Sequence, residues 1–114
     1  MKVQRGQHGL VNDPYDFNRA DGQHGLGIYT FPFGDTAMQE YYTSNGENLY
    51  TFEIPDELVL DMSKSKIDYW EAKKTIYNNN VHKAFMFEHS GSGIPTSKEI
   101  VITDPTIIEN ITKK

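Results

Sequence analysis

Short apolar and aromatic runs alternate with polar stretches along the whole chain, and they predict strands of limited length. β-Branched and aromatic residues crowd into 27–33, which predicts a strand that Pro32 ends or moves to a sheet edge. Residues 49–54 alternate apolar and polar positions as a half-buried strand does. Four further short strands are predicted, at 2–5, 58–60, 84–87 and 99–102.

Helical spacing appears in three places between these strands. Asp35 can cap a helix over 35–44, because the apolar residues that follow it recur at helical spacing. A second helix is predicted over 67–77, and its spacing places on one face Ile67, Trp70, Lys74 and Tyr77. Asp104-Pro105 begins a last helical turn, since Pro suits the first helical position. This turn carries Ile107, Ile108 and Ile111.

Long polar segments separate the predicted elements. Residues 6–26 are rich in Gly, Asp, Asn and His and predict a long loop, the kind that is usually functional in a compact domain. A second loop of Gly, Ser and Pro covers 90–96. Strands and helices do not alternate regularly, so the expected class is α+β. A length of 114 residues fits one domain, 1–114.

Composition excludes several kinds of site and partner. The chain has no Cys, so disulfides and thiolate zinc sites are impossible, and its four His do not form a ligand pattern that would predict a metal. The net charge is −5 and no basic run is longer than the two residues of Lys113-Lys114, which disfavours nucleic acid as a partner. The polar N-terminus and the lack of a run of ~20 apolar residues argue against a secretory signal and a membrane span. We therefore expect a cytoplasmic protein.

Three short motifs follow one another in a distinctive order. The first strand ends in Arg5-Gly6, the strand at 27–33 opens with Gly27-Ile28-Tyr29-Thr30 and leads to a helix containing Tyr41, and the late strand opens with Glu99 behind a Gly-rich loop. This order resembles the ADP-ribosyltransferase superfamily, which includes poly-ADP-ribose polymerases, bacterial toxins and small phage enzymes. The resemblance implies a compact split β-sheet core with two or three short helices, and NAD as the substrate.

The resemblance also implies roles for particular residues. Breaking the nicotinamide–ribose bond passes through an oxocarbenium-like state, which a carboxylate near the ribose stabilises; Glu99 takes this catalytic role. Tyr29 would stack on the nicotinamide, and Arg5 would clamp a phosphate or ribose through its rigid fork of donors. The implied NAD-binding residues are Arg5, Gly6, His8, Gly27, Tyr29, Thr30 and Tyr41, and no metal is implied. We expect Arg5, Tyr29 and Glu99 to converge on one cleft.

Two departures from the family pattern limit these assignments. Ser97 stands where many members that modify Arg carry Glu or Gln, which disfavours Arg as the acceptor side chain. The family's Ser-Thr-Ser on the second core strand is replaced by residues 29–31, which is closer to the polymerase-like branch. That branch uses His on the first strand, so the residue there is Arg5, which we favour, or His8 with a shifted strand.

Several functions are compatible with this sequence. The resemblance implies a mono-ADP-ribosyltransferase that modifies a protein acceptor, such as a phage or bacterial effector acting on a host protein. The alternative is a catalytically inactive module of the same fold that binds or inhibits a host protein. A third is an unrelated α+β fold that only mimics the motifs. In purely structural interpretations, Glu99 is a solvated edge charge, Tyr29 a core residue and Arg5 a surface cation.

Overall fold

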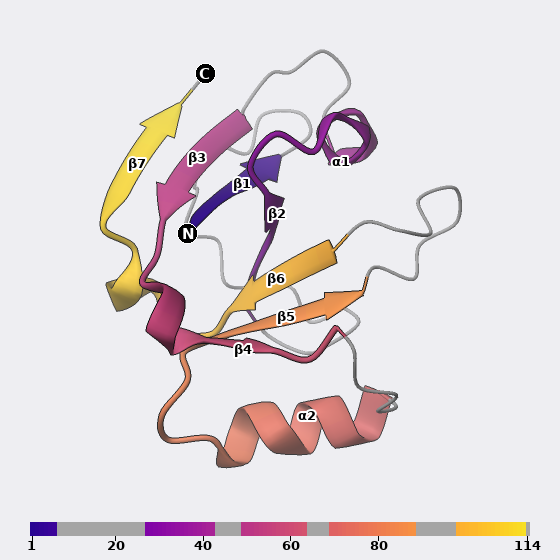
Figure 1. Cartoon of the computed structure of the whole chain (residues 1–114), viewed down its shortest axis with the longest axis vertical. Coiled ribbons are helices and arrows are strands. Elements are labelled where there is room, and N and C mark those ends of the chain that lie inside the picture. The colour runs from indigo at the N-terminus through magenta and orange to yellow at the C-terminus, as the bar shows by residue number, and fades with distance from the viewer. Residues whose placement is uncertain (7–26, 43–48, 64–68, 89–97, 114) are drawn as a thin grey trace.

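The described residues form one mixed seven-stranded sheet with two α-helices. The computed structural model describes residues 1–6, 27–42, 49–63, 69–88 and 98–113 (Figure 1). The strands are β1 (Lys2–Gly6), β2 (Ile28–Pro32), β3 (Leu49–Glu53), β4 (Val59–Asp61), β5 (Ala84–Glu88), β6 (Lys98–Ile102) and β7 (Asn110–Lys113). The helices are α1 (Thr36–Tyr42) and α2 (Tyr69–Asn78), and 3-10 turns cover Asp56–Leu58 and Pro105–Ile107. The predicted α+β class is confirmed.

The sheet is divided at its middle strand. Its order is β4-β5-β6-β2-β1-β3-β7, with β4 and β5 parallel and every other pair antiparallel. Strand β2 pairs with β1 only through Phe31 and Pro32, and with β6 through Ile28, Tyr29 and Thr30. It therefore changes partner along its length, and Figure 1 shows it joining the β1-β3-β7 part of the sheet to the β4-β5-β6 part.

The inner face of the sheet holds the largest apolar cluster. Alternate residues of the strands point to this face, as the pleat requires, and they bring together Val3, Ile28, Tyr50, Phe52, Ile54, Ala84, Met86, Ile100 and Ile102. Residues from both parts of the sheet contribute, so the sheet curls around this cluster. Val59, Ile107 and Ile108 pack against it from the connecting segments.

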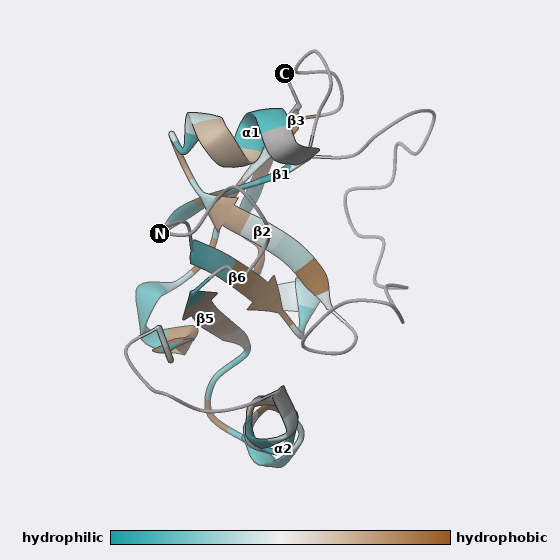
Figure 2. Ribbon diagram, turned by 90° about the vertical axis from the view of Figure 1, so that its right-hand side faces the viewer, coloured by the Kyte–Doolittle hydropathy of each residue, from teal (hydrophilic) through white to brown (hydrophobic). Residues whose placement is uncertain are grey.

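The two helices cover separate parts of the outer face, and Figure 2 shows them at opposite ends of the molecule. Met38 of α1 packs on Phe31 and Leu49. Ala72 and Ile76 of α2 pack in a second cluster, whose other members are Tyr29, Leu60, Met62, Phe85, Phe87 and Val101. The predicted cap is confirmed, since an Oδ1 of Asp35 accepts a hydrogen bond from the Met38 amide at 3.1 Å.

The end of the described chain corrects one prediction. The turn that begins at Asp104-Pro105 is present, and Oδ1 of Asp104 accepts a hydrogen bond from the amide of Thr106. It is a short 3-10 turn, however, and Ile111 lies in strand β7 rather than in a helix. Ile111 pairs with Phe52 of β3. Ladder pairing along the edge of β3 has overridden a weak helical pattern that β-branched residues disfavour.

Candidate functional site

Polar side chains are rare in the interior of the described structure. Only four are buried there, Gln4, Arg5, Thr30 and Glu99. Three of these four belong to the residues that the sequence singled out, and they come from β1, β2 and β6. These strands are neighbours in the sheet, although β6 follows β1 by nearly a hundred residues in the sequence. Burying polar and charged groups costs free energy unless they are satisfied, so a set concentrated on three adjacent central strands needs a specific explanation.

Glu99 occupies the second position of an interior strand. Strand β6 lies between β5 and β2, and Glu99 pairs with Phe87 while retaining only 4% of its accessible surface. The interpretation of Glu99 as a solvated edge charge is therefore wrong. A buried carboxylate is uncommon in proteins unless it is paired or functional.

Arg5 is also buried, with 2% of its surface exposed, so it is not a surface cation. Its side chain leaves β1 opposite Tyr50 of β3, on the inner face that Val3 shares. The guanidinium Nη1 donates a hydrogen bond to the carbonyl oxygen of Tyr29 at 3.2 Å. Arg5 thus connects β1 to β2 just beyond Gln4 and Phe31, the last residues that pair in this ladder.

The motif on β2 has clear structural functions. A Cβ at Gly27 would meet Cγ1 of Val101 at 2.5 Å and the carbonyl oxygen of Ile102 at 3.1 Å, so β6 approaches this backbone too closely for a side chain. Thr30 donates a hydrogen bond from its hydroxyl to the carbonyl oxygen of Ile100 at 2.7 Å. Gly27 therefore permits the close approach of β6 at the start of β2, and Thr30 joins β2 to β6 through a hydrogen bond.

Strand alternation separates the predicted site residues into two groups. Tyr29 pairs with Val101, and Glu99 lies two residues before Val101, so the side chains of Tyr29 and Glu99 leave the sheet on the same outer face. Tyr29 packs there within the apolar cluster under α2 and is 6% exposed. Arg5 and Thr30 start from the inner face. Tyr29 and Glu99 thus share one face, as the core interpretation of Tyr29 also allows, whereas Arg5 leaves the sheet on the other. Strand alternation therefore does not bring the three side chains to one face, as the expected common cleft would require.

The remaining predicted residues contribute less to the described geometry. Gly6 is buried at the end of β1 and pairs with Leu49. Tyr41 lies in the last turn of α1, but its side chain, like the whole of His8, lies outside the described part. Within the described ranges no group of three or more His, Asp or Glu side chains could hold a metal ion.

Gln4 is a buried polar residue that the sequence reasoning missed. Its amide nitrogen donates to the hydroxyl of Thr51 at 3.2 Å, and its amide oxygen accepts from the side-chain nitrogen of Gln39 at 2.7 Å. It thereby connects β1 to β3 and α1. Alternation over residues 2–5 groups Gln4 with the exposed Lys2 and so gives no sign of its burial, which depends on contacts with residues distant in sequence.

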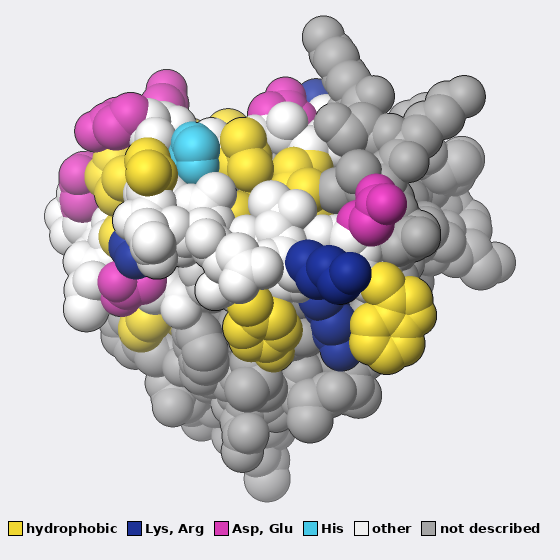
Figure 3. Space-filling view, turned by 90° about the horizontal axis from the view of Figure 1, so that it is seen from below, with side chains coloured by type: hydrophobic (Ala, Val, Ile, Leu, Met, Phe, Trp, Pro, Cys, Tyr) yellow, Lys and Arg dark blue, Asp and Glu magenta, His cyan; other side chains and the backbone are white. Residues whose placement is uncertain are grey.

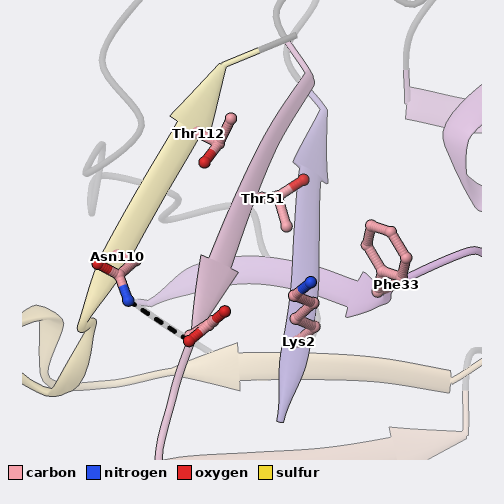
Figure 4. A pocket seen from close by; sticks show the side chains of 6 residues that line it. Lys2, Phe33, Thr51, Asn110 and Thr112 are labelled. Carbon is pink, nitrogen blue, oxygen red and sulfur yellow. Dashed lines mark hydrogen bonds between the residues drawn. The ribbon is translucent and has the colours of Figure 1, made fainter.

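A shallow pocket lies on this outer face, away from the motif residues. It has a volume of about 270 Å³ and is lined by Lys2, Phe33, Thr51, Glu53, Asn110 and Thr112. Figure 4 shows five of these side chains on β1, β3 and β7, and that of Phe33 directly after β2. The Asn110 amide donates a hydrogen bond to a Glu53 carboxylate oxygen at 3.4 Å. The ammonium of Lys2 lies 5.2 Å from the centre of the Phe33 ring. None of the predicted site residues lines this pocket.

Comparison with known proteins gives no match to a family model, to a curated protein or to a solved structure. No helix in the described part of the chain is long and apolar enough to cross a membrane.

Proposed function

We propose that this chain binds NAD and transfers ADP-ribose to a protein acceptor, with Glu99 as the catalytic carboxylate on an ADP-ribosyltransferase-like split sheet. One observation carries the proposal: three of the four buried polar side chains of the described structure are motif residues, Arg5, Thr30 and Glu99. They belong to the three strands that meet where β2 changes partner. The donor and acceptor types suit a ribose diphosphate, which offers hydroxyls to a carboxylate and negative charge to a guanidinium.

The proposed reaction needs a negative charge more than it needs a proton donor. The bond between the ribose C1′ and the nicotinamide nitrogen breaks, nicotinamide leaves as a neutral molecule, and a nucleophilic atom of the acceptor bonds to C1′ while its proton passes to solvent. Positive charge develops on the ribose ring in between. A carboxylate fixed on an interior strand is held in place before the reaction, which is the condition under which such a charge stabilises a transition state effectively.

A second function is favoured by the contacts of two motif residues. Arg5 donates to a backbone carbonyl of β2, and Thr30 donates to a backbone carbonyl of β6. These bonds account for the burial of both residues through the stability of the sheet alone. The same fold would then serve as a catalytically inactive module that binds or inhibits a host protein.

Two measurements separate the candidates. A ligand that binds only the folded state stabilises it by RT ln(1 + [L]/Kd), about 2.7 kcal/mol at a hundredfold excess over Kd. The transferase proposal therefore predicts a higher melting temperature in NAD, and a mass increase of one ADP-ribose on a protein acceptor or on the chain itself. A melting shift without any adduct would favour the inactive module. No shift at millimolar NAD would contradict the family assignment.

A further inference from the structure

Helix α2 turns two large aromatic side chains away from the protein. Trp70 and Tyr77, two turns apart, are each 69% exposed. The helix packs on the sheet through the smaller Ala72 and Ile76 instead. Of the stripe that the sequence places on one face, Trp70, Lys74 and Tyr77 thus face solvent, and Ile67 lies outside the described residues. Figure 3 views the molecule from the α2 side and shows hydrophobic side chains next to Lys or Arg side chains on this surface.

The exposed stripe has the size of an interaction patch. An aromatic side chain buries about 150–250 Å² when it is fully covered, so each exposed ring offers roughly 100–170 Å². Val81, three residues beyond the end of the helix, is also 67% exposed. The sum approaches the ~300–600 Å² of the largest patch on a typical monomer, which is often functional. It stays below the ~800 Å² per partner of a stable complex, which indicates a short, transiently bound segment.

The charges around the rings select the partner. Lys73 places its ammonium 5.6 Å from the centre of the Trp70 ring. Lys74 is exposed and lies between Trp70 and Tyr77 at helical spacing. Glu71 on the same helix is exposed as well, so two lysines and one glutamate leave α2 with a charge of +1. The chain as a whole carries a net charge of −5, so this helix is a weakly positive site on an acidic protein. Such a site attracts negative charge at short range, and Trp and Tyr are the residues that most often dominate binding energy in interfaces.

We propose that the outer face of α2 docks an acidic segment of a partner protein. An apolar side chain of that segment packs between Trp70 and Tyr77, and its carboxylates face Lys73 and Lys74. Aromatic rings and lysines also suit single-stranded nucleic acid. However, two lysines on a chain of net charge −5 would neutralise few phosphates, so the acidic peptide is the better match. This inference is independent of NAD transfer and holds for either function proposed above.

The chain provides its own probe of this surface, because Trp70 is its only tryptophan. The experiment titrates the full chain with a short Glu/Ser peptide that carries two leucines and no aromatic residue. We expect a blue shift of tryptophan emission, protection from acrylamide quenching, and an affinity that falls as salt rises. Tyr77→Ala and Lys74→Glu should each weaken binding about tenfold or more. Phe33→Ala, which removes an exposed aromatic ring from the opposite part of the molecule, should leave it unchanged.

Matched probes give the outcomes that would overturn the proposal. A peptide with Lys in place of Glu must bind much more weakly, and equal binding would exclude charge selection. Tighter binding of a single-stranded oligothymidylate would assign the patch to nucleic acid. Concentration-dependent dimerisation that Tyr77→Ala abolishes would assign it to a second copy of the chain. Absence of any change with the acidic peptide would also refute the inference, since Trp70 must report contact with this face.

Discussion

The guanidinium of Arg5 donates a hydrogen bond to the carbonyl oxygen of Tyr29 at 3.2 Å, where the ladder between β1 and β2 has already ended. The Arg5 side chain thus supplies a donor to the Tyr29 carbonyl at a position where β1 and β2 no longer pair. The bond lies in the interior, where an unsatisfied carbonyl is costly. Arg5 therefore helps to hold the divided sheet together, whatever it binds.

This relationship predicts a stability loss on removal of the guanidinium. Arg5→Met keeps most of the apolar stem but leaves the Tyr29 carbonyl without this donor, so we expect the free energy of unfolding to fall by about 1–3 kcal/mol. Urea denaturation followed by circular dichroism measures it. Lys2→Met removes an exposed cation from the same strand and should change stability by less than about 0.5 kcal/mol. Equal effects of the two substitutions would show that the Arg5 bond contributes nothing.

Gly27→Ala tests the close approach of β2 and β6. The new Cβ would overlap Cγ1 of Val101, which is buried and has little room to rotate, so we expect a loss of about 1–3 kcal/mol in unfolding free energy. Adding Val101→Ala removes the overlapping methyl. The double variant should then be more stable than the sum of the two single losses predicts. Simple additivity in thermal or urea unfolding would contradict the proposed overlap.

Asp104 gives a prediction about pH. Hydrogen bonds from the Thr106 hydroxyl and amide, at 2.6 and 3.0 Å, and the charge of Lys83 lower the pKa of Asp104 below its ordinary value of 3.8. A folded-state pKa below the unfolded value means a stability contribution that is present above the unfolded pKa and lost as pH falls through the folded pKa. Wild type should therefore exceed Asp104→Asn in stability near neutral pH, and the difference should shrink below pH 3.8. A difference that is constant from pH 7 into this acidic range would disprove the linkage.

The sequence predicted the strands and helix caps better than it predicted which face of each element is buried. The strand at 27–33 and the Asp35 cap follow from local chemistry, since β-branched residues and capping oxygens act over a few positions. The outward direction of Trp70 and Tyr77 could not be derived, because helical spacing groups residues on one face without saying whether a sheet covers it. Ile111 was assigned to a helix because its pairing with β3 is a long-range contact that no local pattern announces.

The residues of the candidate site were likewise predicted only in part. Motif order led to three strands that are neighbours in the sheet, with Tyr29 and Glu99 on one face, but it did not predict that Arg5 leaves β1 on the opposite face. It did not reveal that Gly27 and Thr30 have structural reasons of their own, because these depend on the close packing of β6. Burial of Arg5 and Glu99 likewise follows from the central positions of their strands, which short motifs do not encode.

The central claim concerns the charge of Glu99, and Glu88 supplies a matched control. Glu88 lies on the adjacent strand β5, opposite Lys98, but its side chain is exposed. Glu99→Gln keeps the size and the hydrogen-bonding capacity of the side chain while removing the charge. Losing one preorganised charged group costs about 3–4 kcal/mol in transition-state stabilisation, or roughly a hundred- to thousandfold in rate.

The most direct measurement is the rate of ADP-ribose adduct formation, followed by intact mass, for wild type, Glu99→Gln and Glu88→Gln, with NAD affinity measured in parallel. We expect Glu99→Gln to lose transfer about a hundredfold or more while binding NAD nearly as well as wild type, and Glu88→Gln to transfer normally. Wild-type transfer by Glu99→Gln, or loss of transfer in Glu88→Gln alone, would contradict the assignment. An absence of adduct in all three folded proteins would contradict the transferase itself.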